Sequence, residues 1–160
     1  MSFPNDRTYS FDANLLLSDN AAAYTASGFA QVGGQNAILD LGGNQGTSPV
    51  ELARVDCVAV IDATAFDITS GNETYKMIAL VSNDPNFGSG NVAMAGEIEI
   101  GKGTSLDGID MADSVIGRYE LMFSNQLAGQ IYEYVALYLS IGGTTPSLNI
   151  SAFLAVLPEC

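Results

Sequence analysis

Hydrophobic and polar residues alternate along most of this chain, and short groups of Gly, Asn, Asp and Pro interrupt the alternation. Side chains of a β-strand point alternately to its two faces, so this pattern predicts strands separated by turns. The segment 96–100 is the clearest example, since Ile98 and Ile100 are expected to point inward and Glu97 and Glu99 outward.

The pattern predicts about eight strands. They span residues 8–17, 37–41, 55–68, 74–82, 92–100, 118–124, 130–141 and 147–157. The strand over 55–68 is apolar on both faces at its start, which is typical of a central strand covered on both sides. Helix is expected only as a short segment around 109–115, and residues 21–23 admit one turn at most.

The absence of long helices decides the fold class. Parallel strands need long crossover connections, usually helical, and the chain has no segment for them. We therefore predict an all-β fold, an antiparallel two-sheet sandwich, and within that class a jelly roll of about eight strands. The 160 residues are expected to form a single domain over 1–160, with residues 1–7 as an N-terminal arm.

The charge of the chain excludes several classes of partner. Five basic residues stand against 18 acidic ones, for a net charge of −13, and the basic residues form no cluster. Nucleic acids and anionic membranes are bound through clustered Lys and Arg, so neither is expected as a partner. Residues 1–7 do not resemble a secretion signal, and no apolar run approaches the roughly 20 residues of a membrane-spanning helix.

The residue inventory argues against catalysis. The chain has no histidine, so no Ser–His or Cys–His pair can form, and its Gly-rich segments lack the lysine of a phosphate-binding loop. We expect no enzyme activity and no cofactor. Cys57 lies in an apolar strand and is interpreted as a small buried hydrophobic residue, while Cys160 ends the chain; no disulfide between them is assumed.

Two groups of carboxylates have spacings that occur in functional sites. Glu97 and Glu99 lie about 7 Å apart on one strand face, a separation that glycosidases use but that any solvent-facing strand also shows. Three aspartates of the irregular stretch 102–116, Asp107, Asp110 and Asp113, are of a type that binds calcium, although their spacing is not that of an EF-hand. A solvated face and a plain acidic loop are the favoured interpretations, and no metal site is predicted.

Tyrosines supply the candidate partner surface. Tyr132, Tyr134 and Tyr138 share one face of the strand predicted over 130–141, and tyrosine is enriched at protein interfaces. Core packing is the competing interpretation of this face. Phe3 and Arg7 of the N-terminal arm complete the set of candidate interface residues.

The order of elements resembles the small capsid cement, or decoration, proteins of Bordetella-type short-tailed phages. The resemblance rests on Thr8-Tyr9-Ser10-Phe11-Asp12 with Leu17-Ser18-Asp19-Asn20-Ala21, on Ile38-Leu39-Asp40-Leu41-Gly42, on Val81-Ser82-Asn83-Asp84-Pro85-Asn86-Phe87, on Gly117-Arg118-Tyr119 and on a closing apolar strand. It covers most of the chain as an order of elements, through motifs that are short.

The resemblance implies a jelly-roll protein, made in the host cytoplasm, that sits on the capsid exterior of the virion. There it would bridge subunits of the major capsid protein, as a homodimer. The last two strands are candidates for the twofold contact. A rival from another class is a carbohydrate- or calcium-binding β-sandwich, which exposed aromatic residues near Asp107–Asp113 would support. A glycosidase using Glu97 and Glu99 is a third hypothesis.

Overall fold

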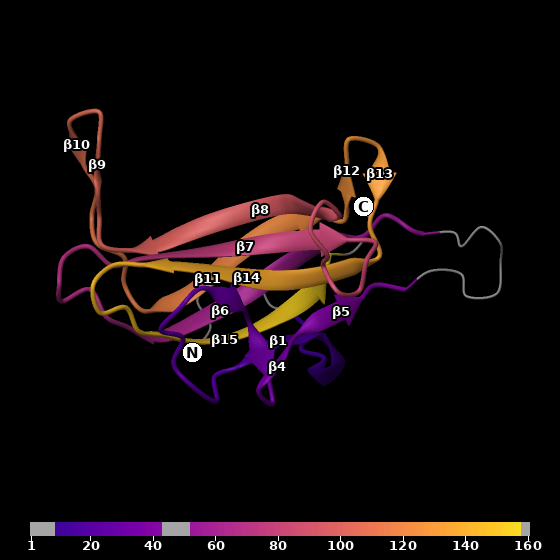
Figure 1. Ribbon diagram of the computed structural model, residues 1–160, viewed down its shortest axis with the longest axis horizontal. Helices are drawn as coiled ribbons and strands as arrows, with labels where there is room; N and C mark the ends of the chain where they lie inside the picture. Colours follow the sequence, from indigo (N-terminus) through magenta and orange to yellow (C-terminus); the bar gives the residue numbers. More distant parts are fainter. Residues whose placement is uncertain (1–8, 43–51, 158–160) are drawn as a thin grey trace.

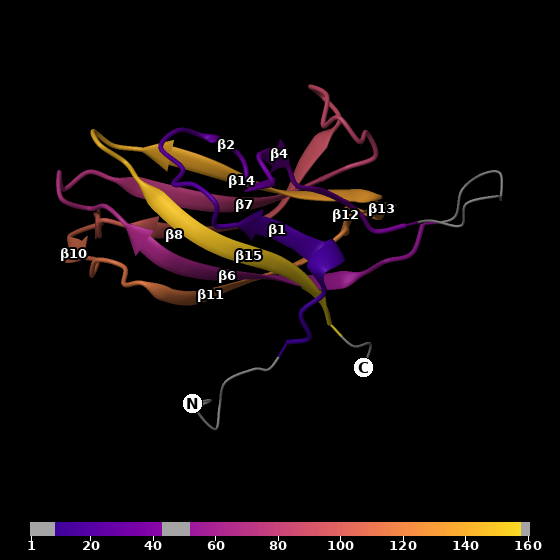
Figure 2. The same ribbon diagram turned by 90° about the horizontal axis from the view of Figure 1, so that it is seen from below.

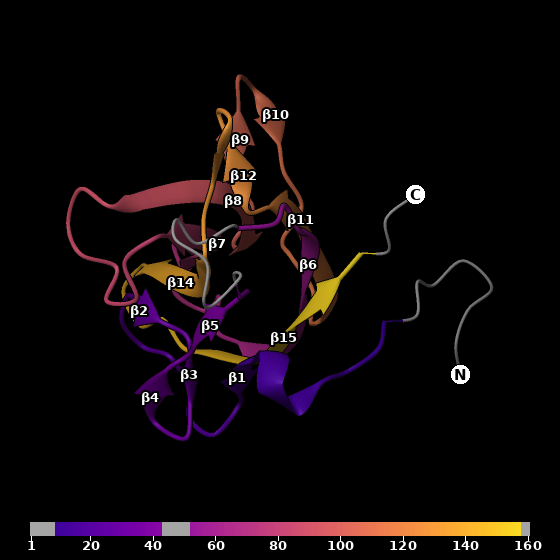
Figure 3. The ribbon, with the colours of Figure 1, turned by 90° about the vertical axis from the view of Figure 1, so that its right-hand side faces the viewer.

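Two antiparallel sheets packed face to face form the body of the protein (Figures 1 and 3). The computed structural model describes residues 9–42 and 52–157. The first sheet has the order β1 (Leu16–Asp19), β15 (Leu148–Val156), β6 (Asp56–Phe66) and β11 (Gly117–Ser124). The second has the order β2 (Gly28–Phe29), β14 (Tyr134–Gly142), β7 (Thr74–Ser82) and β8 (Val92–Gly101), with β5 (Ile38–Asp40) also paired to β14. The predicted antiparallel two-sheet sandwich is confirmed.

Eight strands of the described residues are three or more residues long, four in each sheet. If these eight strands are numbered along the chain, neighbouring strands of the first sheet have the order 1-8-3-6 (β1, β15, β6, β11). Those of the second sheet have the order 2-7-4-5 (β5, β14, β7, β8). This order is consistent with the predicted jelly roll. It also places β14 and β15 inside their sheets, with neighbours on both sides, so neither presents a free edge to a second copy.

Three small ribbons extend from the sheets. They are β3 (Gln31–Val32) with β4 (Gln35–Asn36), β9 (Ser105–Leu106) with β10 (Ile109–Asp110), and β12 (Gln126–Leu127) with β13 (Gln130–Ile131). Each turns through two residues of positive φ: Gly33–Gly34, Asp107–Gly108 and Ala128–Gly129. Such turns match the right-handed twist of the strands that they join.

The core fills the space between the two sheets, which Figure 3 shows in a view along the sandwich. Its members occupy alternate positions of the strands, and Ile61, Tyr75, Met77, Leu137 and Leu154 are among its fully buried side chains. The inward direction predicted for Ile98 and Ile100 is confirmed, and positions 119, 121 and 123 of β11 and 135, 137 and 139 of β14 also face the core.

A smaller apolar cluster covers the outer face of the first sheet. Val58 and Val60 of β6 are fully buried there against Phe153 of β15, and Tyr9 and Leu16 pack on them. The Tyr9 hydroxyl donates to Glu120 over 2.8 Å, which fastens the start of the described chain to β11. Strand β6 is therefore covered on both faces, as its sequence predicted.

The prediction of a long first strand over residues 8–17 is wrong. Only Leu16–Asp19 forms β1, because the Asp12 carboxylate accepts a hydrogen bond from the Asn14 backbone and caps a 3₁₀ turn over Ala13–Leu15. Phe11 consequently stays 60% exposed and touches the Phe153 ring edge-on, where the prediction placed it on a continuous strand face.

The prediction of a short helix around residues 109–115 is also wrong. Residues 105–110 form the β9–β10 hairpin, because Asp107 and Gly108 take positive φ values of 48° and 86° and reverse the chain. The single helical turn considered for 21–23 does not form either, since Asp19 accepts the Ala21 backbone N–H and closes a turn of its own.

Candidate interaction surfaces

The β9–β10 hairpin projects from one end of the sandwich (Figure 1), and exposed apolar side chains lie on it and on the segment that follows it. Ten large hydrophobic residues are exposed in the described part of the chain, and five of them lie between positions 106 and 116. They are Leu106 (62% exposed), Ile109 (66%), Met111 (54%), Val115 (73%) and Ile116 (63%). An apolar group of this kind on an element that leaves the body of the protein is typical of a contact with another macromolecule.

The stem of this hairpin is held by an ion pair and a close backbone approach. Lys102 Nζ lies 2.8 Å from Asp113 Oδ2, and the Gly103 N–H donates to Asp113 Oδ1 over 2.9 Å. A side chain at Gly103 would collide with the backbone of Met111, so only glycine fits this position. The Lys102 hydrogen bond lowers the pKa of the Asp113 carboxyl, and the Gly103 N–H adds to the effect.

The stem also decides what the three aspartates do. Asp113 is engaged by Lys102, while Asp107 lies in the turn and Asp110 in β10, both exposed. Across residues 9–42 and 52–157, no group of three His, Cys, Asp or Glu side chains is arranged to hold a metal ion. The exposed large side chains around these aspartates are aliphatic, and the rival hypothesis looked for aromatic ones.

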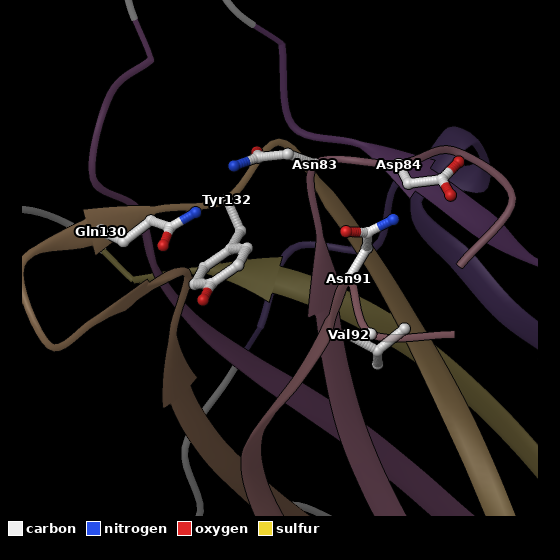
Figure 4. Close-up of a pocket in the computed structure, with 7 residues that line it drawn as sticks. Asn83, Asp84, Asn91, Val92, Gln130 and Tyr132 are labelled. Atoms are coloured by element: carbon white, nitrogen blue, oxygen red, sulfur yellow. The ribbon is translucent and has the colours of Figure 1, made fainter. Parts of the chain in front are cut away.

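A pocket of about 360 Å³ lies at the other end of β8, where the strand begins at Val92. Its walls come from the loop between β7 and β8 and from the β12–β13 hairpin. They are formed by Asn83, Asp84, Gly90, Asn91, Val92, Gln130 and Tyr132. In Figure 4 the Asn83, Asn91, Gln130 and Tyr132 side chains surround one open space, while the Asp84 carboxylate points away from it.

The loop between β7 and β8 is braced by hydrogen bonds. Asp84 accepts the backbone N–H of Asn86 through Oδ1 (2.9 Å) and that of Gly88 through Oδ2 (3.0 Å). The Asn86 bond makes the largest contribution to lowering the pKa of Asp84, followed by the Gly88 bond. The Ser82 hydroxyl donates to the Asn91 carbonyl over 2.7 Å and closes the base of the loop.

The three candidate tyrosines have different surroundings: Tyr134 and Tyr138 lie on the same face of β14, and Tyr132 precedes the strand. Tyr132 precedes β14 and lines the pocket, because the chain leaves the sheet between β13 and β14. Tyr134 is half-buried, and burial together with the nearby Glu133 and Asp40 carboxylates raises its pKa. Tyr138 packs edge-on against Phe29 with 5.3 Å between ring centres, and Phe29 contacts Phe87 of the pocket loop at 5.6 Å.

Of the other residues singled out in the sequence, some lie within the part of the chain that the structure describes and some lie outside it. Phe3, Arg7 and Cys160, and with them the N-terminal arm, lie outside the described residues. Cys57 is fully buried as a free thiol, as predicted, and burial, reinforced by the Asp56 charge, raises its pKa to about 12. Glu97 and Glu99 point outward from β8, and Glu99 Oε2 lies 3.5 Å from Lys76 Nζ.

Sequence reasoning missed both the hairpin and the pocket. The dipeptide Asp107-Gly108 between Leu106 and Ile109 is a strong hairpin signal, and it would have identified the projecting element. The pocket had no comparable signal, since Asn83 and Gln130 are far apart along the chain.

No protein-family model, curated protein or solved structure matches this chain. Among the described residues there is no helix with the length and apolar character needed to cross a membrane.

Proposed function

We propose that this protein is a capsid decoration protein, which binds the outside of a major capsid protein lattice and stabilises the shell without catalysing a reaction. The proposal is supported by the sequence resemblance to phage cement proteins and by the antiparallel sandwich. The observation that carries it is the exposed apolar group at positions 106–116, on the projecting β9–β10 hairpin and the segment that follows it. In this proposal the hairpin is the element that contacts the shell.

The hairpin is suited to insertion into a groove. Burying a Leu, Ile, Val or Met side chain contributes about 1.5–3 kcal/mol, and five such side chains are exposed on the hairpin and the segment that follows it, between positions 106 and 116. The cost of association offsets much of that gain. Two copies joined as a homodimer would recover it, because the second contact forms at high effective concentration on a repeating lattice.

The charges on the hairpin indicate the chemistry of the partner surface. Asp107 and Asp110 lie beside Leu106 and Ile109 and are exposed. A complementary groove on the shell would therefore be apolar at its base and carry Lys or Arg at its rim. The sandwich itself, with its core and braced turns, holds the hairpin in position.

Binding to assembled shells tests the proposal. The purified protein is expected to bind shells of the major capsid protein encoded in the same genome and to raise their disruption temperature. A Leu106→Ser/Ile109→Ser double variant should keep its fold, since both side chains are exposed, and should bind at least about tenfold more weakly because apolar burial is lost. Co-sedimentation and thermal disruption of the shells measure both effects.

Met94→Ser is the matched control, because Met94 is 57% exposed on β8, outside the hairpin. It is expected to bind as the parent does. Absence of binding by the parent protein would overturn the decoration function. Equal binding by the parent and the double variant would overturn the role of the hairpin.

A further inference from the structure

We propose that the pocket between the β7–β8 loop and the β12–β13 hairpin binds an uncharged saccharide unit. This inference goes beyond the decoration function and does not depend on it. The pocket lies where β8 begins, at Val92, and the apolar hairpin follows the end of the same strand at Gly101. At about 3.3 Å per residue the two sites are roughly 30 Å apart, so both can be occupied at once.

The pocket offers both hydrogen-bond donors and acceptors. Each carboxamide supplies two N–H groups and one carbonyl oxygen, which suits a ligand whose hydroxyls both donate and accept. Within the described residues, the Gln130 amide and the Tyr132 hydroxyl have no hydrogen-bond partner and are free for a ligand.

Asn83 and Asn91 are positioned by bonds that leave capacity for a ligand. Asn83 donates one N–H to the Ile131 carbonyl (3.3 Å) and accepts the Glu133 N–H (2.9 Å), so one N–H remains. The Asn91 amide nitrogen points toward Asp84 and its oxygen into the pocket in Figure 4. These two side chains are therefore fixed before a ligand arrives.

The pocket is preformed, which lowers the cost of binding. The bonds to Asp84 brace one wall, and the buried Phe87 anchors that wall on Phe29. The opposite wall is fastened by Asn125, whose amide donates to the Tyr132 carbonyl over 2.9 Å. Neither wall has to reorganise on binding.

Charge and shape define the ligand class. No Lys or Arg is among the lining residues, which disfavours phosphates and carboxylates, and the net charge of −13 repels anions further. The Asp84 carboxylate is already occupied by two N–H groups, which disfavours a cation. The remaining combination of carboxamides with the half-buried Tyr132 ring fits a sugar, whose hydroxyls bond to the amides and whose C–H face packs on the ring. The volume of about 360 Å³ lies within the range of about 300–1,000 Å³ for small-ligand sites.

Side-chain amide NMR tests the proposal on the full chain. The ¹⁵N-labelled protein is titrated separately with glucose, galactose, mannose and N-acetylglucosamine, with sodium acetate as a charged comparator. At least one sugar should shift the Asn83, Asn91 and Gln130 amide signals in a saturable way. The Gln130→Ala variant should bind that sugar about three- to tenfold more weakly, because one or two hydrogen bonds are lost.

Gln35→Ala is the matched control, since Gln35 is an exposed carboxamide on β4, outside the pocket. It should leave the titration unchanged. Tyr132→Phe removes the hydroxyl but keeps the ring, so it tests the hydroxyl alone, and it should also weaken sugar binding. Absence of saturable shifts with all four sugars would overturn the proposal, as would equal shifts with acetate or an undiminished affinity in Gln130→Ala.

Discussion

At the scale of single residues, the Tyr75 hydroxyl joins two turns that are distant in sequence. It donates to the Asp67 carbonyl over 2.6 Å and accepts the Ser147 N–H over 3.0 Å, while its ring is fully buried beside Phe66. The β6–β7 and β14–β15 turns are thereby fastened to each other. Burial raises the pKa of Tyr75.

Further polar contacts connect the same two turns. Asn72 exchanges two hydrogen bonds with Thr144, and the Ser70 and Thr145 hydroxyls lie 2.9 Å apart. The fully buried Glu73 carboxylate accepts the Gly71 and Asn72 N–H groups. Burial by itself would raise the pKa of Glu73, but hydrogen bonds from Ser70 and from backbone N–H groups outweigh it and leave the pKa lowered.

Tyr75→Phe is expected to reduce the free energy of unfolding by about 1–3 kcal/mol, because it leaves the partly buried Asp67 carbonyl and Ser147 N–H without their partner. Urea denaturation followed by circular dichroism measures the change. Tyr138→Phe is the control: no hydrogen bond to the Tyr138 hydroxyl occurs among the described residues, and its ring contact with Phe29 would remain. Equal stability of the two variants would contradict the role of the Tyr75 hydroxyl.

At the scale of elements, the two-residue turns determine what the sandwich displays. Asp107–Gly108 reverses the chain at the tip of the apolar hairpin, and Ala128–Gly129 does so beside the pocket. Both ribbons rise on the same side of the sandwich, one near each end (Figures 1 and 3). The outer face of the first sheet is different: Tyr9, from the part of the described chain that precedes β1, packs on it, and β1 is an edge strand of that sheet beside β15 (Figure 2).

The ion pair in the hairpin stem makes this element sensitive to acid. Since the folded-state pKa of Asp113 lies below its ordinary value of 3.8, the pair contributes stability above that value and is lost as the pH falls through the lower folded-state pKa. An NMR titration of the Asp113 carboxyl carbon should show a midpoint below 3.8.

Lys102→Met tests the cause of this shift. Removal of the ammonium group should move the Asp113 midpoint upward, toward the ordinary value, while the Gly103 N–H bond keeps part of the shift. A midpoint that is the same in the parent and the variant would show that Lys102 does not hold the carboxylate.

At the scale of the whole molecule, the acidic charge and the exposed apolar residues act in opposite directions on self-association. A net charge of −13 on each copy opposes dimer formation, and the exposed apolar side chains favour it. Any stable contact between two copies must therefore bury apolar surface and tolerate charge repulsion.

The predicted homodimer leads to a test in solution. Light scattering after size exclusion should give twice the chain mass of 16.7 kDa, and the dimer fraction should rise with salt because screening weakens the repulsion. A mass of one chain at every protein and salt concentration would contradict the dimer.

The sequence by itself determined most of the strands and their inward faces. Five of the eight predicted strands, 55–68, 74–82, 92–100, 118–124 and 147–157, each match one long strand closely, and β7 has the predicted bounds of 74–82. The strand predicted over 37–41 contains the three-residue β5, and the one predicted over 130–141 is interrupted before β14. The reason is that burial of one face imposes a period of two on the residues of each strand, and this period can be read within the strand's own segment of sequence. The first strand failed because the Asp12 side chain competes for the backbone, an effect that hydrophobic alternation does not register.

Tertiary structure alone decided where the surfaces of interest lie. The pocket requires Asn83 and Asn91 to meet Gln130 and Tyr132, and that meeting depends on how β7 and β14 pair and where the chain leaves the sheet. The same break separated Tyr132 from Tyr134 and Tyr138, with which it appeared to share a face. Pairing register and chain reversal join distant segments, whereas alternation reports only whether each position of a strand is buried.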